Sequence, residues 1–391
     1  MKILIALTYY RPHISGLTIY AERLAKAFAV RGHEVTLMTA QFDKSLPREE
    51  MVDGVKIVRV PVWFRLSKGC IMPQFMGIAR RLVRESDAVL LHLPQFEAAS
   101  VAFDGRRYKK PTVTTYHCDL LMPPGFISKL ANVGIHMMNQ FTGRYSNRIV
   151  TYTQDYADHS AYLRGFLSKV HIITPPVVLP EASAQEIAQF AKTHNPQNEH
   201  PVIGMAARFA TEKGVEILLN ALPEVLAKYP NAKVQFVGPY IDIIGEQDYL
   251  KRLMPTIEKY QQSGNWEFVG SLQPKQMAAF YPNLDVLVLP SLNSTEAFGL
   301  VQIEAMMNGV PCVASNLPGV RQPVKVHNMG RIFEIGDAKG CASALLEVLE
   351  TMPRVKNIEC SQFDRYSPDY VATEYEKLFL TIQAEIDSST H

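Results

Sequence analysis

Short apolar runs alternate with longer stretches of helical periodicity through the first 180 residues. The first run covers residues 3–7, and Tyr20, Leu24 and Phe28 then recur every fourth residue, which predicts a helix. Because apolar runs of this kind are typical of parallel strands with helices on both faces, the order predicts a βαβ opening. Further runs predict strands at residues 34–38, 55–60, 88–91, 112–116, 149–152 and 170–173.

Prolines and polar residues interrupt this alternation between residues 174 and 200, a composition typical of a linker around at most one helix. The alternation then resumes, and a periodic stretch near the end predicts a helix over about 368–388. We therefore predict an α/β fold with two Rossmann-like doubly wound domains, at residues 1–178 and 198–365, facing across a cleft. The strands expected in the second domain are 202–205, 234–238, 266–269, 286–289 and 310–314.

Composition excludes several classes of protein. With 47% hydrophobic and 20% charged residues among 391, the chain is typical of globular proteins and not of disordered or fibrous ones. We find no apolar run long enough to span a membrane and no signal-peptide pattern, which predicts a cytoplasmic protein. The five cysteines form no C-x-x-C pair and no zinc spacing, so we expect neither a disulfide framework nor a zinc site.

Charge is divided unevenly along the chain. Residues 1–180 carry 23 Lys and Arg against 13 Asp and Glu, a net charge of +10, whereas residues 181–391 carry 17 against 25, a net charge of −8. A basic half suits nucleic acid, an anionic membrane or a phosphorylated substrate, and charge alone does not choose among them. Bulky apolar residues beside Arg and Lys at 63–68 and 75–84 favour contact with an anionic membrane, although a solvated basic face is the simpler alternative.

Two loops after strands have the composition of phosphate sites. Gly16 lies where the first helix begins, so a ligand can approach free backbone N–H groups at the positive end of the helix dipole. The G-x-G-x-x-G pattern of dinucleotide sites is absent. Arg208 and Lys213 precede a helix of the second domain, where cations oppose the usual dipole preference unless an anion such as a diphosphate joins them.

Two glutamates, Glu296 and Glu304, flank a predicted loop-to-helix transition at Gly299. On a continuous helix, eight residues would separate the carboxylates by ~12 Å, which is too far for a glycosidase pair. The two could instead hold opposite ends of one extended ligand, such as a ribose diol and a sugar ring, with backbone N–H groups between them. A capping Glu296 and a solvated Glu304 remain the alternative.

Taken in order, these motifs resemble glycosyltransferase family 4, whose members are retaining, nucleotide-sugar-dependent transferases of the GT-B fold. The resemblance covers nearly the whole chain. It implies a donor bound by the second domain, an acceptor held by the first, and a C-terminal helix that returns to the first domain. The matching residues are Ser15-Gly16, residues 31–36, Thr115-Tyr116-His117, residues 208–214, residues 296–304 and residues 309–315.

The resemblance also implies roles for individual residues. Glu304 would hold the donor ribose and Glu296 the transferred sugar, whereas Arg208 and Lys213 would neutralise the diphosphate. In the first domain, Gly16 would let its loop close on the diphosphate, and His117 would line the sugar side. The backbone of Phe298, Gly299 and Leu300 would assist the donor.

The implied reaction moves a sugar from a nucleoside diphosphate sugar to an acceptor hydroxyl on a glycan or a lipid-linked molecule, without nucleic acid. No D-x-D metal clamp is present in the sequence, so we expect neither an essential metal nor a cofactor. The alternatives are a nucleotide-sugar epimerase, a phosphorylase or a non-catalytic nucleotide-sugar-binding protein. Release of the nucleoside diphosphate would distinguish a transferase from these.

Overall fold

The computed structural model describes residues 1–66, 69–120, 126–178, 180–355 and 358–389. The chain divides into two compact units, each with its own sheet. Unit 1 comprises Met1–Val177 with Asp364–His391, and unit 2 comprises Val178–Phe363. The division lies inside the stretch in which the sequence predicts a linker. The helix in that stretch, α6 (Ala184–His194), belongs to unit 2, which therefore begins at Val178 and not at residue 198.

Unit 1 is built on an eight-stranded sheet in the order β10-β9-β8-β7-β1-β2-β4-β3. All neighbouring strands are parallel except β3 (Glu49–Val52), which pairs antiparallel with β4 at one edge. The order reverses between β1 and β7, where a doubly wound sheet opens a crevice at its carboxyl edge. The parallel strands are β1 (Lys2–Ala6), β2 (Glu34–Gln41), β4 (Val55–Pro61), β7 (Ala88–Leu93), β8 (Thr112–Tyr116), β9 (Arg148–Thr151) and β10 (Val170–Ile172).

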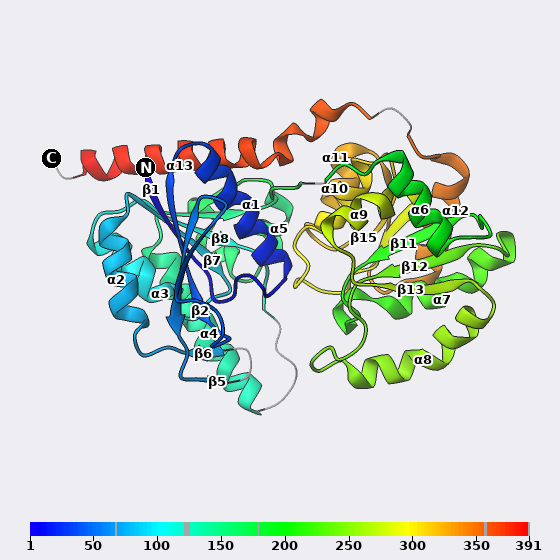
Figure 1. Cartoon of the computed structure of the whole chain (residues 1–391), viewed down its shortest axis with the longest axis horizontal. Coiled ribbons are helices and arrows are strands. Elements are labelled where there is room, and N and C mark those ends of the chain that lie inside the picture. The colour runs from blue at the N-terminus through cyan, green and yellow to red at the C-terminus, as the bar shows by residue number, and fades with distance from the viewer. Residues whose placement is uncertain (67–68, 121–125, 179, 356–357, 390–391) are drawn as a thin grey trace. The chain divides into compact units, whose positions relative to one another are not determined.

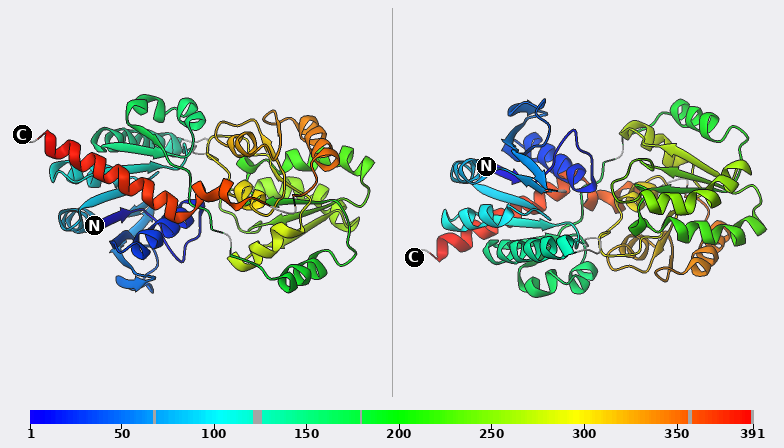
Figure 2. Two further views of the ribbon diagram at one scale, coloured as in Figure 1. Left: turned by 90° about the horizontal axis from the view of Figure 1, so that it is seen from above. Right: turned by 90° about the horizontal axis from the view of Figure 1, so that it is seen from below.

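Helices cover both faces of this sheet (Figures 1 and 2). The C-terminal helix, α13 (Pro368–Ser388), packs against α1 (Gly16–Val30), and the hydroxyl groups of Tyr20 and Tyr375 lie 2.9 Å apart between them. The helix at the end of the chain therefore belongs to unit 1. The other helical segments of unit 1 are α2 (Phe75–Glu85), α3 (Ala98–Arg107), α4 (Phe126–Tyr145), α5 (Gln154–His159) and the 3₁₀ segment Leu163–Lys169.

Unit 2 contains a six-stranded parallel sheet in the order β13-β12-β11-β14-β15-β16. Counted within the unit this is 3-2-1-4-5-6, the strand order of dinucleotide-binding folds, with the reversal between β11 and β14. The strands are β11 (Val202–Ala206), β12 (Lys233–Val237), β13 (Trp266–Gly270), β14 (Val286–Leu289), β15 (Cys312–Ser315) and β16 (Gly330–Phe333).

The core of unit 2 lies between this sheet and the helices on its faces. Contacts join α7 (Val215–Lys228) to α12 (Ala338–Thr351), and α6 to α9 (Pro274–Phe280). Strands such as β11 are buried at every position because both sheet faces are covered. The remaining helices are α8 (Gln247–Gln262), α10 (Leu300–Met306) and α11 (Gln322–His327), with 3₁₀ turns at Thr211–Lys213 and Tyr281–Asn283. A further 3₁₀ turn, Cys360–Tyr366, begins in unit 2 and ends in unit 1.

The strands that the sequence misses are short or carry charge. The edge strand β3 begins with Glu49-Glu50, and the edge strand β16 has four residues that include Arg331. The hairpin of β5 (Phe64–Leu66) and β6 (Gly69–Ile71) has strands of three residues each. Such segments lack the apolar runs from which the other strands are predicted. Within the described parts of the chain, none of the helices combines the length and the apolar character that a membrane span requires.

Candidate active site

The predicted donor residues of unit 2 follow the two strands at which the strand order reverses. Arg208 and Lys213 come after β11, and Glu296 and Gly299 come after β14. Because β11 and β14 are parallel neighbours, both loops leave the same carboxyl edge of the sheet. The reversal in strand order thus places four predicted site residues on two adjacent loops.

A glycine allows these two loops to touch. Gly214 adopts a left-handed conformation with φ of 67°, and a Cβ atom on it would lie 2.1 Å from the carbonyl oxygen of Pro290. Beside it, the backbone N–H of Leu292 donates to the carbonyl oxygen of Glu212 at 2.9 Å. Any larger residue at 214 would push the loops apart, so the sequence sets their spacing at this point.

Lys213 and Glu296 meet across the contact. The Lys213 Nζ donates to Glu296 Oε2 at 2.5 Å, and the two side chains are 19% and 18% exposed. Glu296 is held by a turn in which its backbone N–H donates to the carbonyl oxygen of Asn293 at 3.2 Å. The ammonium and carboxylate therefore lie together at the carboxyl edge, where a ligand with both phosphate and hydroxyl groups could engage each of them.

Arg208 has a partner on its own loop. Its guanidinium donates to the Glu212 carboxylate, and the Arg208 side chain is the more exposed of the two. The same loop is held to the loop between β12 and α8, because Glu246 Oε2 accepts hydrogen bonds from the backbone N–H and the hydroxyl of Thr211. A diphosphate reaching Arg208 would compete with Glu212 for the guanidinium.

Gly299 marks the start of α10, as the sequence predicts. Its φ of 79° is left-handed, and a Cβ atom would lie 2.3 Å from Leu289 Cδ2. Glu296 therefore lies in a loop and not on a helix with Glu304, so the ~12 Å separation expected for a continuous helix does not apply. Phe298 is buried and Leu300 is half-buried beside this turn.

Glu304 lies on α10 and accepts a hydrogen bond from a residue that the sequence analysis does not single out. The hydroxyl of Tyr281, which is buried, donates to Glu304 Oε2 at 2.7 Å. The glutamate is half-buried. The tyrosine thus orients the carboxylate that the family resemblance assigns to the ribose.

Gly16 is the first residue of α1 in unit 1. The Ser15 hydroxyl caps the helix by accepting from the backbone N–H of Thr18 at 3.2 Å. Gly16 is exposed, and a Cβ atom on it would meet no atom within 4 Å among the described residues. The space above the helix start is open to a ligand on the unit 1 side.

His117 follows β8 at the carboxyl edge of the unit 1 sheet and is 7% exposed. Its Nε2 lies 2.8 Å from Nδ1 of His92, and its Nδ1 is hydrogen-bonded to the hydroxyl of Tyr152. The Tyr20 ring packs edge-on against the His117 imidazole with centroids 5.0 Å apart. The histidine is therefore held by hydrogen bonds at both ring nitrogens.

Burial keeps both imidazoles neutral at pH 7. It lowers the pKa of His92 to about 3. Burial, assisted by the neighbouring His92, holds the pKa of His117 well below its usual range. One ring must donate and the other accept across their shared hydrogen bond. A neutral His117 can hydrogen-bond to a sugar hydroxyl only if it gives up one of its two partners, His92 and Tyr152, and it cannot neutralise a diphosphate.

Family models match both units. The model described as "Glycosyltransferase Family 4" matches residues 14–179, and the model described as "Glycosyl transferases group 1" matches residues 186–364. Between them they cover most of the chain. The chain belongs to glycosyltransferase family 4.

Individual relatives of this family 4 glycosyltransferase match it over most of their length. An uncharacterised glycosyltransferase of Methanocaldococcus jannaschii is 26% identical over 353 residues, with 85% of each chain covered. A phosphatidyl-myo-inositol mannosyltransferase of Mycolicibacterium smegmatis is 24% identical over 340 residues, covering 86% of this chain and 81% of its own. The crystal structure of Anabaena HepE with UDP-glucose is similar with a TM-score of 0.67 at 19% identity, covering 100% and 99%. The similarity to this solved structure identifies the fold as GT-B, with two Rossmann-like domains.

Of the predicted site residues in this family 4 chain, the structure brings Lys213 and Glu296 into direct contact and places Arg208 on the same loop pair. Gly16 and His117 belong to the other unit. Sequence reasoning missed Glu212, Tyr281 and His92, which hold Arg208, Glu304 and His117. Of these, His92 carries a signal, because it is a titratable residue directly after the apolar run 88–91.

Proposed function

We propose that this protein is a retaining hexosyltransferase that moves a sugar from a nucleoside diphosphate sugar to a hydroxyl group of a glycan or a lipid-linked acceptor. The single observation that carries the proposal is the contact of Lys213 with Glu296 at the reversal point of the unit 2 sheet. This position is where doubly wound folds bind nucleotides. A cation for phosphate and a carboxylate for hydroxyl groups are the two chemistries that the donor requires.

The charges that develop in the reaction explain why cations belong here. Breaking the bond between the anomeric carbon and the phosphate leaves an oxocarbenium-like sugar and a more negative diphosphate. Arg208 and Lys213 then stabilise the transition state more than the bound donor, because the negative charge on the diphosphate increases as the bond breaks. In this proposal Arg208 exchanges Glu212 for the phosphate, and no metal ion is needed.

Retention of configuration would follow if the acceptor attacks from the face that the diphosphate leaves. The departing phosphate then takes the proton of the acceptor hydroxyl. Glu296 and the backbone from Phe298 to Leu300 would hold the sugar, and Glu304 would hold the ribose. On the unit 1 side, Gly16 would admit the diphosphate, and His117 would meet a sugar hydroxyl as a neutral hydrogen-bonding group.

Relatives support this class of donor and acceptor. Several solved neighbours have names that state UDP or UDP-glucose as the bound molecule, and the mycobacterial relative is named for a lipid acceptor, phosphatidyl-myo-inositol. We infer that the acceptor side of this protein works at an anionic membrane surface, with the protein bound peripherally. The +10 charge of residues 1–180 supports this inference.

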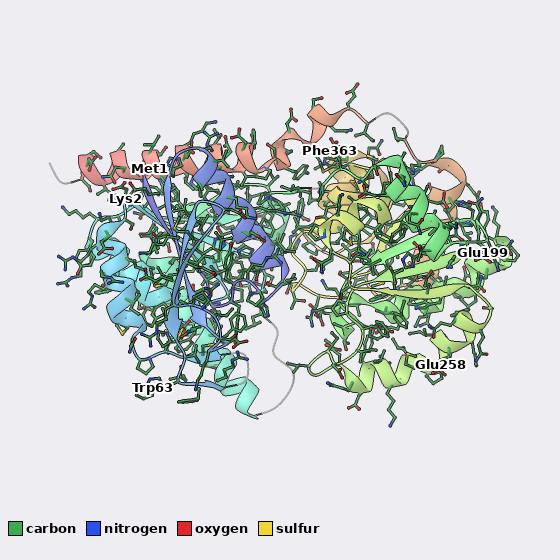
Figure 3. All side chains as sticks on the ribbon, viewed as in Figure 1. Met1, Lys2, Trp63, Glu199, Glu258 and Phe363 are labelled. Atoms are coloured by element: carbon green, nitrogen blue, oxygen red, sulfur yellow. The ribbon has the colours of Figure 1, made fainter. Side chains whose placement is uncertain are left out.

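The apolar residues suited to membrane contact lie on the β5–β6 hairpin. Trp63 is 72% exposed, and Phe64 and Ile71 are also exposed. Figure 3 shows Trp63 at the periphery of unit 1. Exposed aromatic residues on a basic unit are typical of interfacial contacts.

Helix α2 supplies cations together with one exposed apolar residue, Met76, which is 56% exposed. Its apolar residues Leu82 and Val83 face the protein interior, whereas Arg81 and Arg84 are exposed. Arg80 has a structural role, because its Nε lies 3.3 Å from Oδ1 of Asp104, which is buried. The basic face of α2 would therefore contact lipid headgroups mainly by electrostatic attraction.

The proposed reaction is tested by incubating the protein with UDP-, GDP- and ADP-linked glucose and mannose. We expect release of the nucleoside diphosphate from one of them, and proton NMR of the first product should show the anomeric configuration of the donor. Release should fall strongly in Lys213→Ala and persist in Lys228→Ala, which removes an exposed cation from the same unit. Binding without release would identify a binding protein, and an isomerised nucleotide sugar would identify an epimerase.

The membrane inference is tested by flotation with phosphatidylglycerol-containing and phosphatidylcholine vesicles. Binding should require the anionic lipid, weaken with salt and fall in Trp63→Ser and in Arg81→Glu/Arg84→Glu. Leu380→Ser, which alters an exposed apolar residue on α13, is the matched control. Arg80 is left intact because a carboxylate there would face Asp104. Equal partitioning to both vesicles, or none to either, would contradict the inference.

A further inference from the structure

Unit 1 has a pocket at the edge of its sheet opposite to Gly16 and His117. Residues 109 and 110 lie before β8, residues 146–148 lie at the start of β9, and Lys169 comes directly before β10. These are the amino ends of the strands, whereas ligands of doubly wound sheets bind at the carboxyl ends. The pocket is therefore distinct from both halves of the proposed transferase site.

The pocket has the size of a small-molecule site and a cationic lining. Its volume is about 400 Å³, within the range of about 300–1,000 Å³ typical of ligand pockets. No aspartate or glutamate is found among the described residues that line it. The cationic residues of the lining are Arg106, Lys109, Lys110, Arg148 and Lys169.

Several of these cations are engaged with the protein, among them Arg106, whose Nη1 donates to the carbonyl oxygen of Arg144 at 3.4 Å. Lys169 Nζ donates to the carbonyl oxygens of Gly143, Arg144 and Ser146, at 3.0, 3.0 and 2.9 Å, and so caps the end of α4. Arg148 donates to the Glu385 carboxylate of α13. These bonds fix the positions of Lys169 and Arg148, and the lining as a whole keeps an excess of positive charge.

The crowding of these charges has an electrostatic cost. Burial lowers the pKa of Lys169, and the nearby Arg106, Arg148 and Arg144 lower it further. A bound anion would remove this repulsion, because each cation would gain an opposite charge within the same small volume. The arrangement is therefore better matched to an occupied site than to an empty basic surface.

We propose that this pocket binds an anion that carries a phosphate group, contributed by a soluble phosphate compound or by a lipid headgroup. Arg106 and Lys110 would supply charge-assisted hydrogen bonds, and Arg148 and Lys169 would form the floor. The volume leaves room for an organic portion attached to the phosphate. The aromatic ring of Tyr145, which lines the pocket and packs edge-on against exposed Phe103 with centroids 5.3 Å apart, would contact that portion.

The test uses sodium pyrophosphate as the soluble probe, with hydrogen exchange read by mass spectrometry to locate its binding. We expect slower exchange in peptides covering residues 104–112, 143–149 and 383–389, which surround the pocket. Arg106→Gln/Lys110→Gln should weaken this protection about tenfold or more in pyrophosphate concentration, whereas Arg106→Lys/Lys110→Arg should retain it. The control Lys56→Gln/Lys377→Gln removes two exposed cations of the same unit, each ion-paired with a glutamate, and should behave as wild type.

Flotation with phosphatidylglycerol vesicles separates the two sources of phosphate. Loss of vesicle binding in Arg106→Gln/Lys110→Gln, with Trp63 intact, would support a lipid headgroup. Loss of pyrophosphate protection alone would support a soluble phosphate compound. If neither pyrophosphate protection nor vesicle binding differs between this variant and wild type, the proposed site is refuted. Protection confined to unit 2 would refute it as well, because pyrophosphate would then bind at the proposed donor residues of unit 2 and not in this pocket.

Discussion

Breaking the Lys213–Glu296 pair should destabilise unit 2 by a measurable and non-additive amount. Fully exposed ion pairs contribute about 0–1 kcal/mol, and removing one partner of a fully buried pair costs about 3–5 kcal/mol. With the two side chains 19% and 18% exposed and 2.5 Å apart, this pair lies between those limits. We expect Lys213→Met and Glu296→Gln each to lower the free energy of unfolding by about 1.5–3 kcal/mol.

The chain offers a fluorescence reporter for this measurement. Of its two tryptophans, Trp266 is 3% exposed in the core of unit 2, whereas Trp63 is 72% exposed in unit 1. In a Trp63→Phe background, tryptophan emission during urea titration therefore reports the unfolding of unit 2. The exposed pair of Lys228 with Glu350 in the same unit serves as the matched control.

The double variant decides the outcome. Lys213→Met/Glu296→Gln should cost less than the sum of the two single changes, with a coupling energy of about 1–2 kcal/mol. The corresponding cycle for Lys228 and Glu350 should be additive within about 0.5 kcal/mol. Additivity of the Lys213 cycle to the same degree would show that the contact has no energetic role, and it would refute the assignment of these side chains as a coupled pair.

Three further results are expected. Glu304→Ala should weaken donor binding by roughly 1.5–3 kcal/mol. Tyr281→Phe should weaken it by less, because the carboxylate would remain and lose only the hydrogen bond from the tyrosine. Unchanged donor affinity of Glu304→Ala in calorimetry would contradict the assignment of Glu304 to the ribose. Turnover should survive EDTA, and activity lost to EDTA but restored by Mg²⁺ or Mn²⁺ would reveal a metal clamp. Because the pKa of His92 is low in the folded chain, its imidazole takes up a proton below about pH 6.5 only when the chain is unfolded. His92 should therefore lower the free energy of unfolding by up to about 1.4 kcal/mol for each pH unit of acidification. His92→Gln should flatten that slope in urea titrations of unit 1, and an unchanged slope would contradict the assignment.

Much of the fold could be predicted because fully buried parallel strands are readable as apolar runs. Thr112–Tyr116 and Val286–Leu289 are strands with the bounds that the sequence predicts. Gly299 likewise predicts the loop-to-helix transition correctly, because the left-handed backbone before α10 favours a glycine at that position. Strand β3 is not predicted, because it lies at the edge of the sheet and is mostly exposed, so it needs no apolar run.

The site was harder to predict than the fold, because its contacts join distant parts of the sequence. Motifs identified Lys213 and Glu296 separately, but their pairing depends on β11 and β14 being neighbours and on the approach that Gly214 allows. The partners Tyr281 and His92 have no motif of their own. Their roles follow from packing, in which a residue far along the chain supplies the hydrogen bond that orients a predicted one.

The kinetic effect of Arg208→Ala tests most directly whether unit 2 stabilises a departing diphosphate. Steady-state rates would be measured over a range of donor concentrations, with Lys228→Ala as the control. We expect kcat to fall about 100-fold, and by a larger factor than the donor KM rises, because the guanidinium meets a charge that grows as the bond breaks. A raised KM with kcat unchanged would contradict this mechanism and reduce Arg208 to a group that only binds the donor.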